Sequence, residues 1–444
     1  MPGPAASGPP GRLALVLLGL GVLCLFADQN LMAPNLSAIA RDLGLDPVER
    51  DVKLGGDISL VFWLLGGTVS LAVGALTDRL PRRRLFAAVL LIGELPCLLT
   101  AFAATYEQLF WLRALTGLGV GGAIPLCYSL LGDLVPSERR ARASAALGLM
   151  SGLGIALGQG IAGGLGPTQG WRLPFILVAV PGLVVGLAFL LLVQEPARGA
   201  AEDELRGLRE RGEDYRVRLD LRAWLAIFRV RTNVLVFLQG IPGMVPWGVF
   251  FVFLNDYLAQ DRGLDVGAAT LLIMTVGAAS IVGGFGGGLV GNALFNRRPA
   301  LLPLLCGVAA IVGVVPTLLL LHYPSQVGVA EPELGPAFAI AAITGLIVAI
   351  PSANVRAILL DVNPPETRGS VFSLFNLADD LGKGFGPVII AALIARLGRA
   401  TAFDVAALFW VACGVVLLAL VPAFPRDQAA MRALLRERAA SQAR

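Results

Sequence analysis

The sequence predicts an all-α polytopic membrane protein with twelve transmembrane helices arranged as two six-helix bundles. Three observations support this fold class: the composition, the number of long apolar runs and an internal repeat. Of 444 residues, 56% are hydrophobic and only 15% are charged, and the mean hydropathy is +0.76. A soluble globular chain of this length does not carry so much apolar surface, so we expect the chain to lie in a membrane.

The chain contains about twelve runs of roughly 20 apolar residues, the length that a helix needs to cross a bilayer. A polar segment rich in arginine and glutamate separates the sixth run from the seventh. We therefore predict an N-terminal bundle (residues 1–194), a cytoplasmic linker (195–229), a C-terminal bundle (230–424) and a cytoplasmic tail (425–444). The expected spans are residues 12–36, 55–77, 85–104, 108–131, 142–165, 172–193, 230–259, 267–291, 299–321, 336–360, 370–394 and 401–423.

Arginine-rich loops determine the predicted orientation. Residues 74–84 contain four arginines between two apolar runs, and arginine and lysine are retained on the cytoplasmic side of a membrane. Placing the linker on the same side brings the arginines near positions 140, 298 and 368 there too. We predict a multi-pass protein of the cell (inner) membrane with both termini in the cytoplasm. The formal net charge of +4 then reflects topology and contact with anionic lipids, and it does not indicate nucleic-acid binding.

An internal repeat supports two homologous halves. The motif D-x-x-P-x-E-x-R follows the fourth expected span and recurs 228 residues later, after the tenth. The same offset aligns two glycines of the fifth span with two of the eleventh, and small residues four apart allow helix backbones to approach closely. The aligned residues are Asp133, Pro136, Glu138 and Arg140 with Asp361, Pro364, Glu366 and Arg368, and Gly154 and Gly158 with Gly382 and Gly386.

The loop of residues 74–84 resembles the G-x-L-x-D-R-x-x-R-R motif of the major facilitator superfamily. The two D-x-x-P-x-E-x-R loops and Arg113 in the fourth span are similar to other markers of that superfamily. The resemblance covers essentially the whole chain. It implies the major facilitator fold, in which two bundles rock about a central cavity.

Three shorter segments, residues 27–31, 171–175 and 239–248, resemble Spinster-like transporters of the bacterial type. This resemblance implies a lysophospholipid or a sphingosine-phosphate-like substrate, and it implies coupling to protons. The sequence departs from the family pattern at Val120, where the resemblance leads us to expect a glutamate seven residues after Arg113.

Ionisable side chains inside the spans are candidate functional residues because an ionised group costs at least a few kcal/mol at mid-membrane. Asp28 of the first span and Arg113 of the fourth lie at similar predicted depths, so the two side chains can meet. Separated from Arg113, Asp28 would take up a proton; alternatively, Arg113 would bind a substrate phosphate or carboxylate. A fixed ion pair between two helices is the third alternative. Glu94 of the third span is a further candidate for proton coupling or substrate binding.

Other polar side chains of the spans are candidates for the cavity. Asp379 and Lys383 are four residues apart, so they either neutralise each other on one helix face or bind substrate. Aromatic residues of the seventh span suit a substrate with an apolar tail. The candidate cavity residues are Gln29, Asn30, Trp247, Phe251, Asn255, Asp379, Asp380 and Lys383.

Charged residues of the cytoplasmic loops form a predicted intracellular gate. Charge pairs between the bundles would hold the outward-open state, and a few kcal/mol over such pairs is enough to bias two conformations. The predicted gate consists of Gly74, Asp78, Arg79, Arg82, Arg83, Asp133, Glu138, Arg140, Asp361, Glu366 and Arg368.

No arrangement of residues in the sequence indicates an enzyme. The five cysteines stand singly inside apolar runs, and neither a catalytic constellation nor a cofactor-binding loop is present, so we predict no cofactor and no metal site. The energy source would be a proton gradient.

The sequence therefore predicts a secondary active transporter, proton-coupled and monomeric, that moves an amphipathic organic anion or a lysophospholipid by alternating access. Its partners would be this substrate, protons and membrane lipids, without nucleic acid. A broad-specificity exporter of drugs or hydrophobic compounds is one alternative, and a non-transporting sensor or passive scramblase is another. The sequence does not distinguish import of the substrate from its export or from flipping between the two leaflets.

Overall fold

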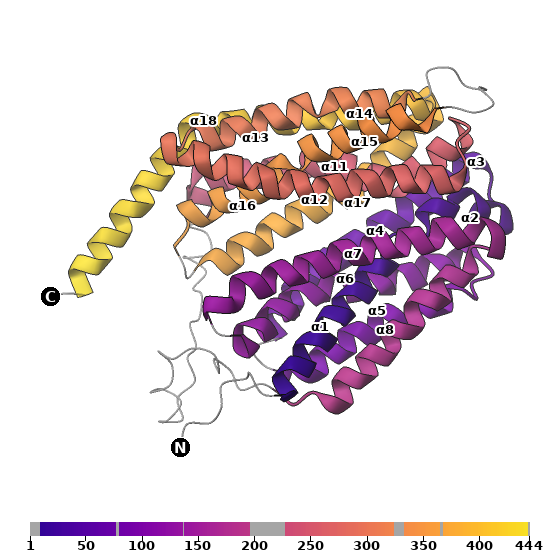
Figure 1. Ribbon diagram of the computed structural model, residues 1–444, viewed down its shortest axis with the longest axis horizontal. Helices are drawn as coiled ribbons and strands as arrows, with labels where there is room; N and C mark the ends of the chain where they lie inside the picture. The colour runs from indigo at the N-terminus through magenta and orange to yellow at the C-terminus, as the bar shows by residue number, and fades with distance from the viewer. Residues whose placement is uncertain are drawn as a thin grey trace. The chain divides into compact units, whose positions relative to one another are not determined.

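The computed structural model of the chain describes residues 9–76, 80–135, 137–195, 227–323, 333–364 and 367–442, and the regular structure of these residues is entirely helical (Figure 1). The chain forms two compact units, Met1–Arg218 and Leu219–Arg444. Each unit contains six long helical segments among its described residues. The predicted linker lies outside the described residues from position 196 to 226.

The described residues of unit 1 form six long helices and, between the first two of them, four short helical elements. The long helices are α1 (Pro9–Asp28), α4 (Ile58–Leu76), α5 (Arg82–Thr100), α6 (Tyr106–Leu134), α7 (Ser137–Gln169) and α8 (Arg172–Leu192). The short elements are η1 (Ala33–Asn35), α2 (Leu36–Asp42), α3 (Pro47–Glu49) and η2 (Arg50–Asp57).

Unit 2 repeats the six-helix plan, with two of its segments divided into shorter helices. Its elements are η4 (Ile227–Arg229), α11 (Arg231–Gln260), α12 (Val266–Arg297), α13 (Leu301–Val312), α14 (Val314–Leu321), α15 (Leu334–Val348), α16 (Ile350–Val362), α17 (Arg368–Leu397) and α18 (Arg399–Gln442). The divisions fall just before Pro316 and Pro351, because a proline has no N–H to donate to the preceding turn.

The twelve predicted spans are all present as helical segments, so the predicted all-helical fold class is confirmed. Among the residues that the structure describes, ten segments are long and apolar enough to cross a membrane. The other two, α5 and α17, carry more charge: α5 begins with three arginines, and α17 has Asp379, Asp380 and Lys383 near its middle. In the predicted tail, α18 continues as a helix to Gln442.

The first span differs from the expectation of one helix over residues 12–36. Helix α1 ends at Asp28, residues 29–32 are not helical, and the chain resumes as η1 and α2. Pro34 supplies part of the reason, since it cannot donate a hydrogen bond to the carbonyl of Asn30. Interrupted backbone is tolerated at membrane depth only where protein groups satisfy it, and the site described below shows which group does so.

Glycines set the closest helix contacts in both units, as the repeat predicted. A Cβ atom at Gly158 of α7 would collide with the carbonyl oxygen of Ala27 in α1, and Gly154 meets the carbonyl of Leu23 in the same way. In unit 2, Gly382 of α17 meets the backbone of α11. The small-residue faces therefore pack against the first long helix of each unit.

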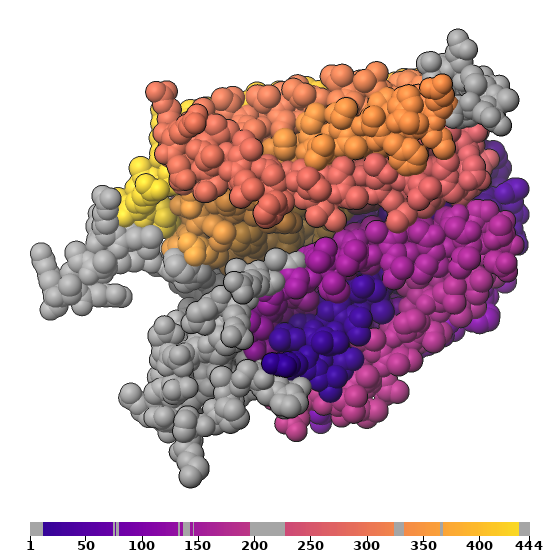
Figure 2. Space-filling view, in the orientation of Figure 1, coloured from indigo at the N-terminus to yellow at the C-terminus, as the bar shows by residue number. Residues whose placement is uncertain are grey.

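Apolar side chains fill the interior of each unit and also cover its outer surface. Leu18 and Leu25 of α1 pack with Phe86 and Leu90 of α5 in the core of unit 1. Large apolar residues of many helices are exposed, with Phe285 of α12 at 73%. Figure 2 shows the helices of each unit in close contact. An apolar exterior of this kind is expected for helices that face lipid.

We expect Gly158→Ala to destabilise the protein by about 1–3 kcal/mol, because the added methyl group must displace the backbone of α1. Unfolding in mixed detergent micelles measures the change. Gly164→Ala on the same helix is the matched control, since nothing lies within 4 Å of a Cβ at that position. Equal stability of the two variants would contradict the close crossing of α1 and α7.

Candidate functional site

The centre of the candidate site is an ion pair between α1 and α6. Nη1 of Arg113 lies 2.6 Å from Oδ1 of Asp28, and both side chains are buried, with 2% and 0% of their surfaces exposed. The predicted meeting of these two residues is therefore present. A buried pair of this kind is costly to desolvate, and removing either partner would leave an uncompensated charge.

Arg113 also completes the interrupted end of α1. Its Nη2 donates a hydrogen bond of 3.2 Å to the backbone carbonyl of Asp28, the last residue of the helix. The final carbonyls of a helix have no partner within the helix, and they carry the negative end of its dipole. A single guanidinium thus binds both the side chain and the main chain of Asp28. Sequence reasoning did not reveal this second contact, because it assumed a continuous first span.

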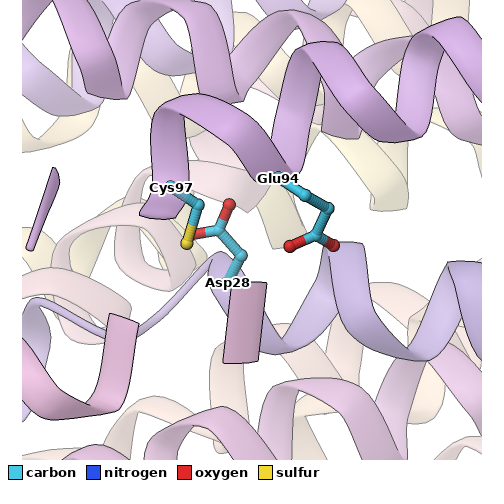
Figure 3. A group of neighbouring side chains, drawn as sticks. All are labelled: Asp28, Glu94 and Cys97. Carbon is cyan, nitrogen blue, oxygen red and sulfur yellow. The ribbon is translucent and has the colours of Figure 1, made fainter. Parts of the chain in front are cut away.

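Glu94 and Cys97 of α5 lie beside the ion pair. The carboxylates of Asp28 and Glu94 and the thiol of Cys97 each offer an atom within 4.8 Å of the others, and Figure 3 shows Glu94 and Cys97 on the same helix flanking Asp28. Glu94 is fully buried, and neither of its carboxylate oxygens has a hydrogen-bond partner among the described residues. The structure thus brings Glu94 next to the predicted Asp28–Arg113 pair. No pattern in the sequence predicted this contact of α5.

Small residues make room for the Glu94 side chain. A Cβ atom at Gly182 of α8 would overlap the carboxyl group of Glu94. Next to Glu94, Gly93 crosses Gly119 of α6 closely: a Cβ atom at Gly119 would collide with the backbone of Gly93, and one at Gly93 would collide with the side chain of Leu25. Any side chain at Gly182 would therefore displace the carboxylate from its place beside Asp28.

Two aromatic rings flank the guanidinium. The centroids of Phe62 in α4 and Phe175 in α8 lie 5.2 and 5.9 Å from Cζ of Arg113. The electron-rich face of an aromatic ring attracts a cation at these distances. The rings also surround the charge with apolar atoms, so its electrostatic interactions are stronger than they would be in water.

The residues that follow α1 are attached to α7 by polar side chains. Asn30 donates to Oε1 of Gln159 at 3.0 Å, and Asn35 donates to the carbonyl of Ala162 at 2.8 Å. Gln159 is 98% buried, and its Nε2 has no hydrogen-bond partner in the described part of the chain. Oε1 of Gln29 also has no hydrogen-bond partner there. Sequence reasoning missed Gln159, which follows directly after the close-packed Gly158.

Two carboxylates and a thiol also form a donor set that a divalent cation accepts. In this protein the guanidinium of Arg113 already supplies the positive charge at Asp28. A second cation among these ligands would lie close to Arg113 and would be repelled by it. We therefore assign the counter-charge of this cluster to Arg113 and do not assign a metal site.

Unit 2 contains a cavity of about 80 Å³, several times the 10–15 Å³ or so that one water molecule requires. Trp247 of α11 and Trp410 of α18 line it, with ring centroids 5.9 Å apart. Phe375 and Met244 add apolar surface, and Arg356 also lines the cavity. The predicted cavity residue Phe251 packs against Trp247 at 5.5 Å.

Asp379 of α17 lines the same cavity. It is 6% exposed, and its Oδ1 has no hydrogen-bond partner among the described residues. Lys383 donates to Asp380 at 3.2 Å, three residues away, whereas the sequence pattern paired it with Asp379. Asn255, another predicted cavity residue, instead donates to Thr270 of α12 at 2.8 Å.

The predicted gate residues that the structure describes have partners within their own unit. The backbone N–H groups of Arg82 and Arg83 each donate to Glu195 at 2.8 Å, so this carboxylate caps α5. Asp361 accepts from Gln428 at 3.0 Å, and Arg368 donates to carbonyls at the end of α16. The side chains of Asp133, Glu138 and Arg140, together with all of Asp78, Arg79 and Glu366, lie outside the described residues, as does the surrounding of Gly74.

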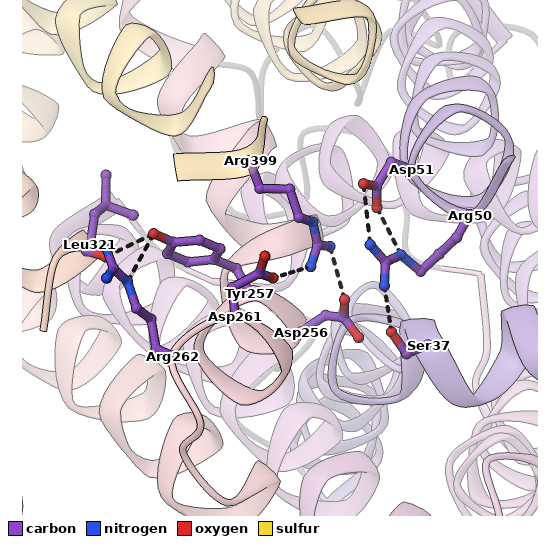
Figure 4. Close-up of polar contacts among 9 residues, drawn as sticks. All are labelled: Ser37, Arg50, Asp51, Asp256, Tyr257, Asp261, Arg262, Leu321 and Arg399. Carbon is purple, nitrogen blue, oxygen red and sulfur yellow. Dashed lines mark hydrogen bonds and ion pairs between the residues drawn. The ribbon is translucent and has the colours of Figure 1, made fainter. Parts of the chain in front are cut away.

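Each unit also has a polar network that sequence reasoning did not predict (Figure 4). In unit 2, Arg399 at the start of α18 binds Asp256 at 2.8 Å and Asp261 at 2.7 Å. In unit 1, Arg50 binds Asp51 at 2.9 Å and Ser37 at 2.8 Å. In unit 2 these contacts join the start of α18 to the end of α11, and in unit 1 they join η2 to α2.

The sequence matches the Major Facilitator Superfamily over residues 18–331 and 327–443. It is 30% identical to the niacin transporter NiaP of Acinetobacter baylyi over 180 residues, 40% of each chain. It is 31% identical to the 4-hydroxybenzoate transporter PcaK of Pseudomonas aeruginosa over 173 residues, 39% of this chain and 37% of that one. The chain thus spans about two fifths of the length of these two relatives.

Among the solved structures with a similar fold is a bacterial homologue of the human lysosomal transporter Spinster, in an inward-facing and unoccupied conformation. The TM-score is 0.78, the sequence identity is 19%, and the match covers 95% of this chain and 99% of the other. Together with the superfamily match, this similarity confirms the predicted major facilitator fold.

We expect Arg113→Ala to destabilise the protein by about 3–5 kcal/mol, because it leaves the buried Asp28 carboxylate unpaired. The double variant Asp28→Leu/Arg113→Met should recover at least half of this loss, because no unpaired charge remains. Unfolding in mixed micelles measures both. Lys53→Ala, which breaks an exposed pair with Glu49, is the control and should cost at most about 1 kcal/mol. A double variant no more stable than Arg113→Ala would argue against the charge explanation.

Proposed function

The chain belongs to the Major Facilitator Superfamily, and we propose that this secondary transporter couples proton movement to the passage of an amphipathic organic anion by alternating access. The observation that carries the proposal is the buried Asp28–Arg113 pair at the interrupted end of α1. A permanently charged guanidinium inside a membrane-spanning unit is a binding group for an anion. The adjoining carboxylates are groups that can hold a proton.

Competition for Arg113 gives the proposed coupling mechanism. A phosphate or carboxylate of the substrate would bind the guanidinium with two parallel hydrogen bonds and would compete there with the side chain of Asp28. The bound anion would then share the counter-charge of the Asp28 and Glu94 carboxyl groups. Uptake of a proton by one of these groups would offset the added negative charge, so substrate and proton binding favour each other.

The cavity of unit 2 supports a substrate with an apolar body. Its walls include Trp247, Trp410 and Phe375, which suit a flat ring or an acyl chain. An aromatic carboxylate and a lysophospholipid both combine such a body with an anionic group. The relatives named as niacin and 4-hydroxybenzoate transporters support the first class. The resemblance of residues 27–31 to Spinster-like transporters supports the second.

We propose that the protein acts as a monomer and lies in the cell membrane. Both termini would be in the cytoplasm, because the arginine-rich loops then lie on the cytoplasmic side. In this orientation the gate residues around positions 78, 138 and 366 would hold one conformation by charge pairs. The capping contacts of Arg82, Arg83 and Arg368, and the hydrogen bond from Gln428 to Asp361, would fix the helix ends from which those loops emerge.

We expect the protein in proteoliposomes to accumulate a labelled aromatic carboxylate or a labelled lysophospholipid when a pH gradient is imposed, and not without one. Asp28→Asn and Arg113→Ala should each lower accumulation by about a hundredfold, since both remove the buried pair. Gradient-driven movement of unrelated hydrophobic compounds, with neither anion transported, would support the drug exporter instead. Folded protein that moves none of these compounds would refute the proposal.

We expect Trp247→Ala to weaken substrate affinity by about tenfold, equivalent to 1.4 kcal/mol, because it removes an aromatic wall of the cavity. The Michaelis constant for uptake and direct binding to purified protein both measure the effect. Trp111→Ala is the matched control, because Trp111 is 63% exposed on the surface of α6. Unchanged affinity in Trp247→Ala would exclude this cavity from substrate binding.

A further inference from the structure

We infer that Glu94 carries the coupling proton, while Asp28 stays ionised as the fixed counter-ion of Arg113. The inference rests on the proposed function, and it assigns different roles to two carboxyl groups that the sequence could not distinguish. Glu94 lies on α5, away from the α1–α6 contact that forms the ion pair.

The hydrogen bonds of the two carboxyl groups differ. Asp28 accepts two hydrogen bonds from Arg113: its side chain accepts from Nη1 at 2.6 Å, and its backbone carbonyl accepts from Nη2 at 3.2 Å. Glu94 is equally buried, yet both of its oxygens lack a partner among the described residues. Burying an ionised carboxylate without a hydrogen bond costs far more than burying a neutral carboxyl group. The geometry therefore supports a charge on Asp28 but does not support one on Glu94.

The charge balance of the cluster requires one proton. Helices α1, α6 and α8 pack against α5. The groups they direct toward Glu94 are Cys24 and Asp28 from α1, Arg113 from α6 and the backbone of Gly182 from α8. Cys97 of α5 also belongs to the cluster. If the two thiols are neutral, two ionised carboxylates and one guanidinium would leave a net charge of −1 in a buried site. One proton on Glu94 makes the cluster neutral without disturbing the ion pair.

Loss of that proton would change the contacts of Arg113. The proton leaves an oxygen of Glu94 for the opposite compartment, and the new carboxylate attracts the guanidinium in competition with Asp28. Because Nη2 of Arg113 also holds the last carbonyl of α1, a shift toward Glu94 would release that helix end. The protonation of Glu94 is thereby linked to the conformation of the interrupted first span.

The decisive experiment compares Glu94→Gln with Asp28→Asn in proteoliposomes. Two readouts are needed: gradient-driven accumulation of the labelled substrate together with proton flux, and counterflow exchange of substrate at equal pH. Glu94→Gln mimics the protonated residue, so we expect it to lose accumulation and proton flux by at least about tenfold while exchange stays within about twofold of wild type. Asp28→Asn should lose both activities. Glu107→Gln, at an exposed position of α6, should retain both.

Two outcomes would overturn the inference. One is proton-driven accumulation by Glu94→Gln at the wild-type level. The other is a loss of accumulation in Asp28→Asn while exchange is retained, because this result would make Asp28 the proton carrier. A wild-type protein that exchanges substrate without any proton flux would instead overturn the proposed function, because substrate transport would then not be coupled to protons at all.

Infrared spectroscopy provides a second test that does not depend on transport. A protonated buried carboxyl group has a C=O stretching band separate from that of a carboxylate. We expect wild-type protein at neutral pH to show a band that disappears in Glu94→Gln and persists in Asp28→Asn. A band lost only in Asp28→Asn, or lost in neither variant, would contradict the assignment of the proton to Glu94.

Discussion

The contact of Arg113 with Asp28 solves two problems of a helix that ends inside a membrane-spanning unit. An interrupted helix exposes carbonyl groups, and a buried aspartate carries a charge that requires a partner. Arg113 satisfies both with one guanidinium, at 2.6 Å from the carboxylate and 3.2 Å from the carbonyl. The interruption after Asp28 is therefore stable only while this arginine is in place, and any group that competes for the arginine also acts on the helix.

Features that depend on local composition were predictable from the sequence. The number of spans follows from apolar length, the Asp28–Arg113 pair follows from the cost of isolated charges in lipid, and the close packing of Gly158 follows from the repeat. The position of Glu94 beside Asp28 was not predictable. It depends on how α5 is rotated against α6 and α8, and Gly119 and Gly182, which permit that rotation, are indistinguishable in the sequence from many other glycines.

The charged loop motifs show a similar limit of sequence reasoning. Arginines and carboxylates near a membrane face suggest pairs between two bundles, yet a helix end nearby always offers unpaired N–H or carbonyl groups. Glu195 caps α5, and Arg368 binds carbonyls at the end of α16, so local capping accounts for these described contacts. A charged residue in such a motif can therefore be explained by a hydrogen bond at a nearby helix end, so the motif alone does not identify a gate.

The two units use one packing device for different chemistry. In each, a pair of glycines four residues apart presses against the first long helix: Gly154 and Gly158 against α1, and Gly382 and Gly386 against α11. Beside this crossing, α1 ends and Arg113 binds its last residue, whereas α11 continues through Pro242 and Pro246 beside an aromatic cavity. Because glycine constrains only the distance between backbones, the side chains next to the crossing are free to differ. The duplicated framework can therefore place a charge-binding group in one unit and apolar walls in the other.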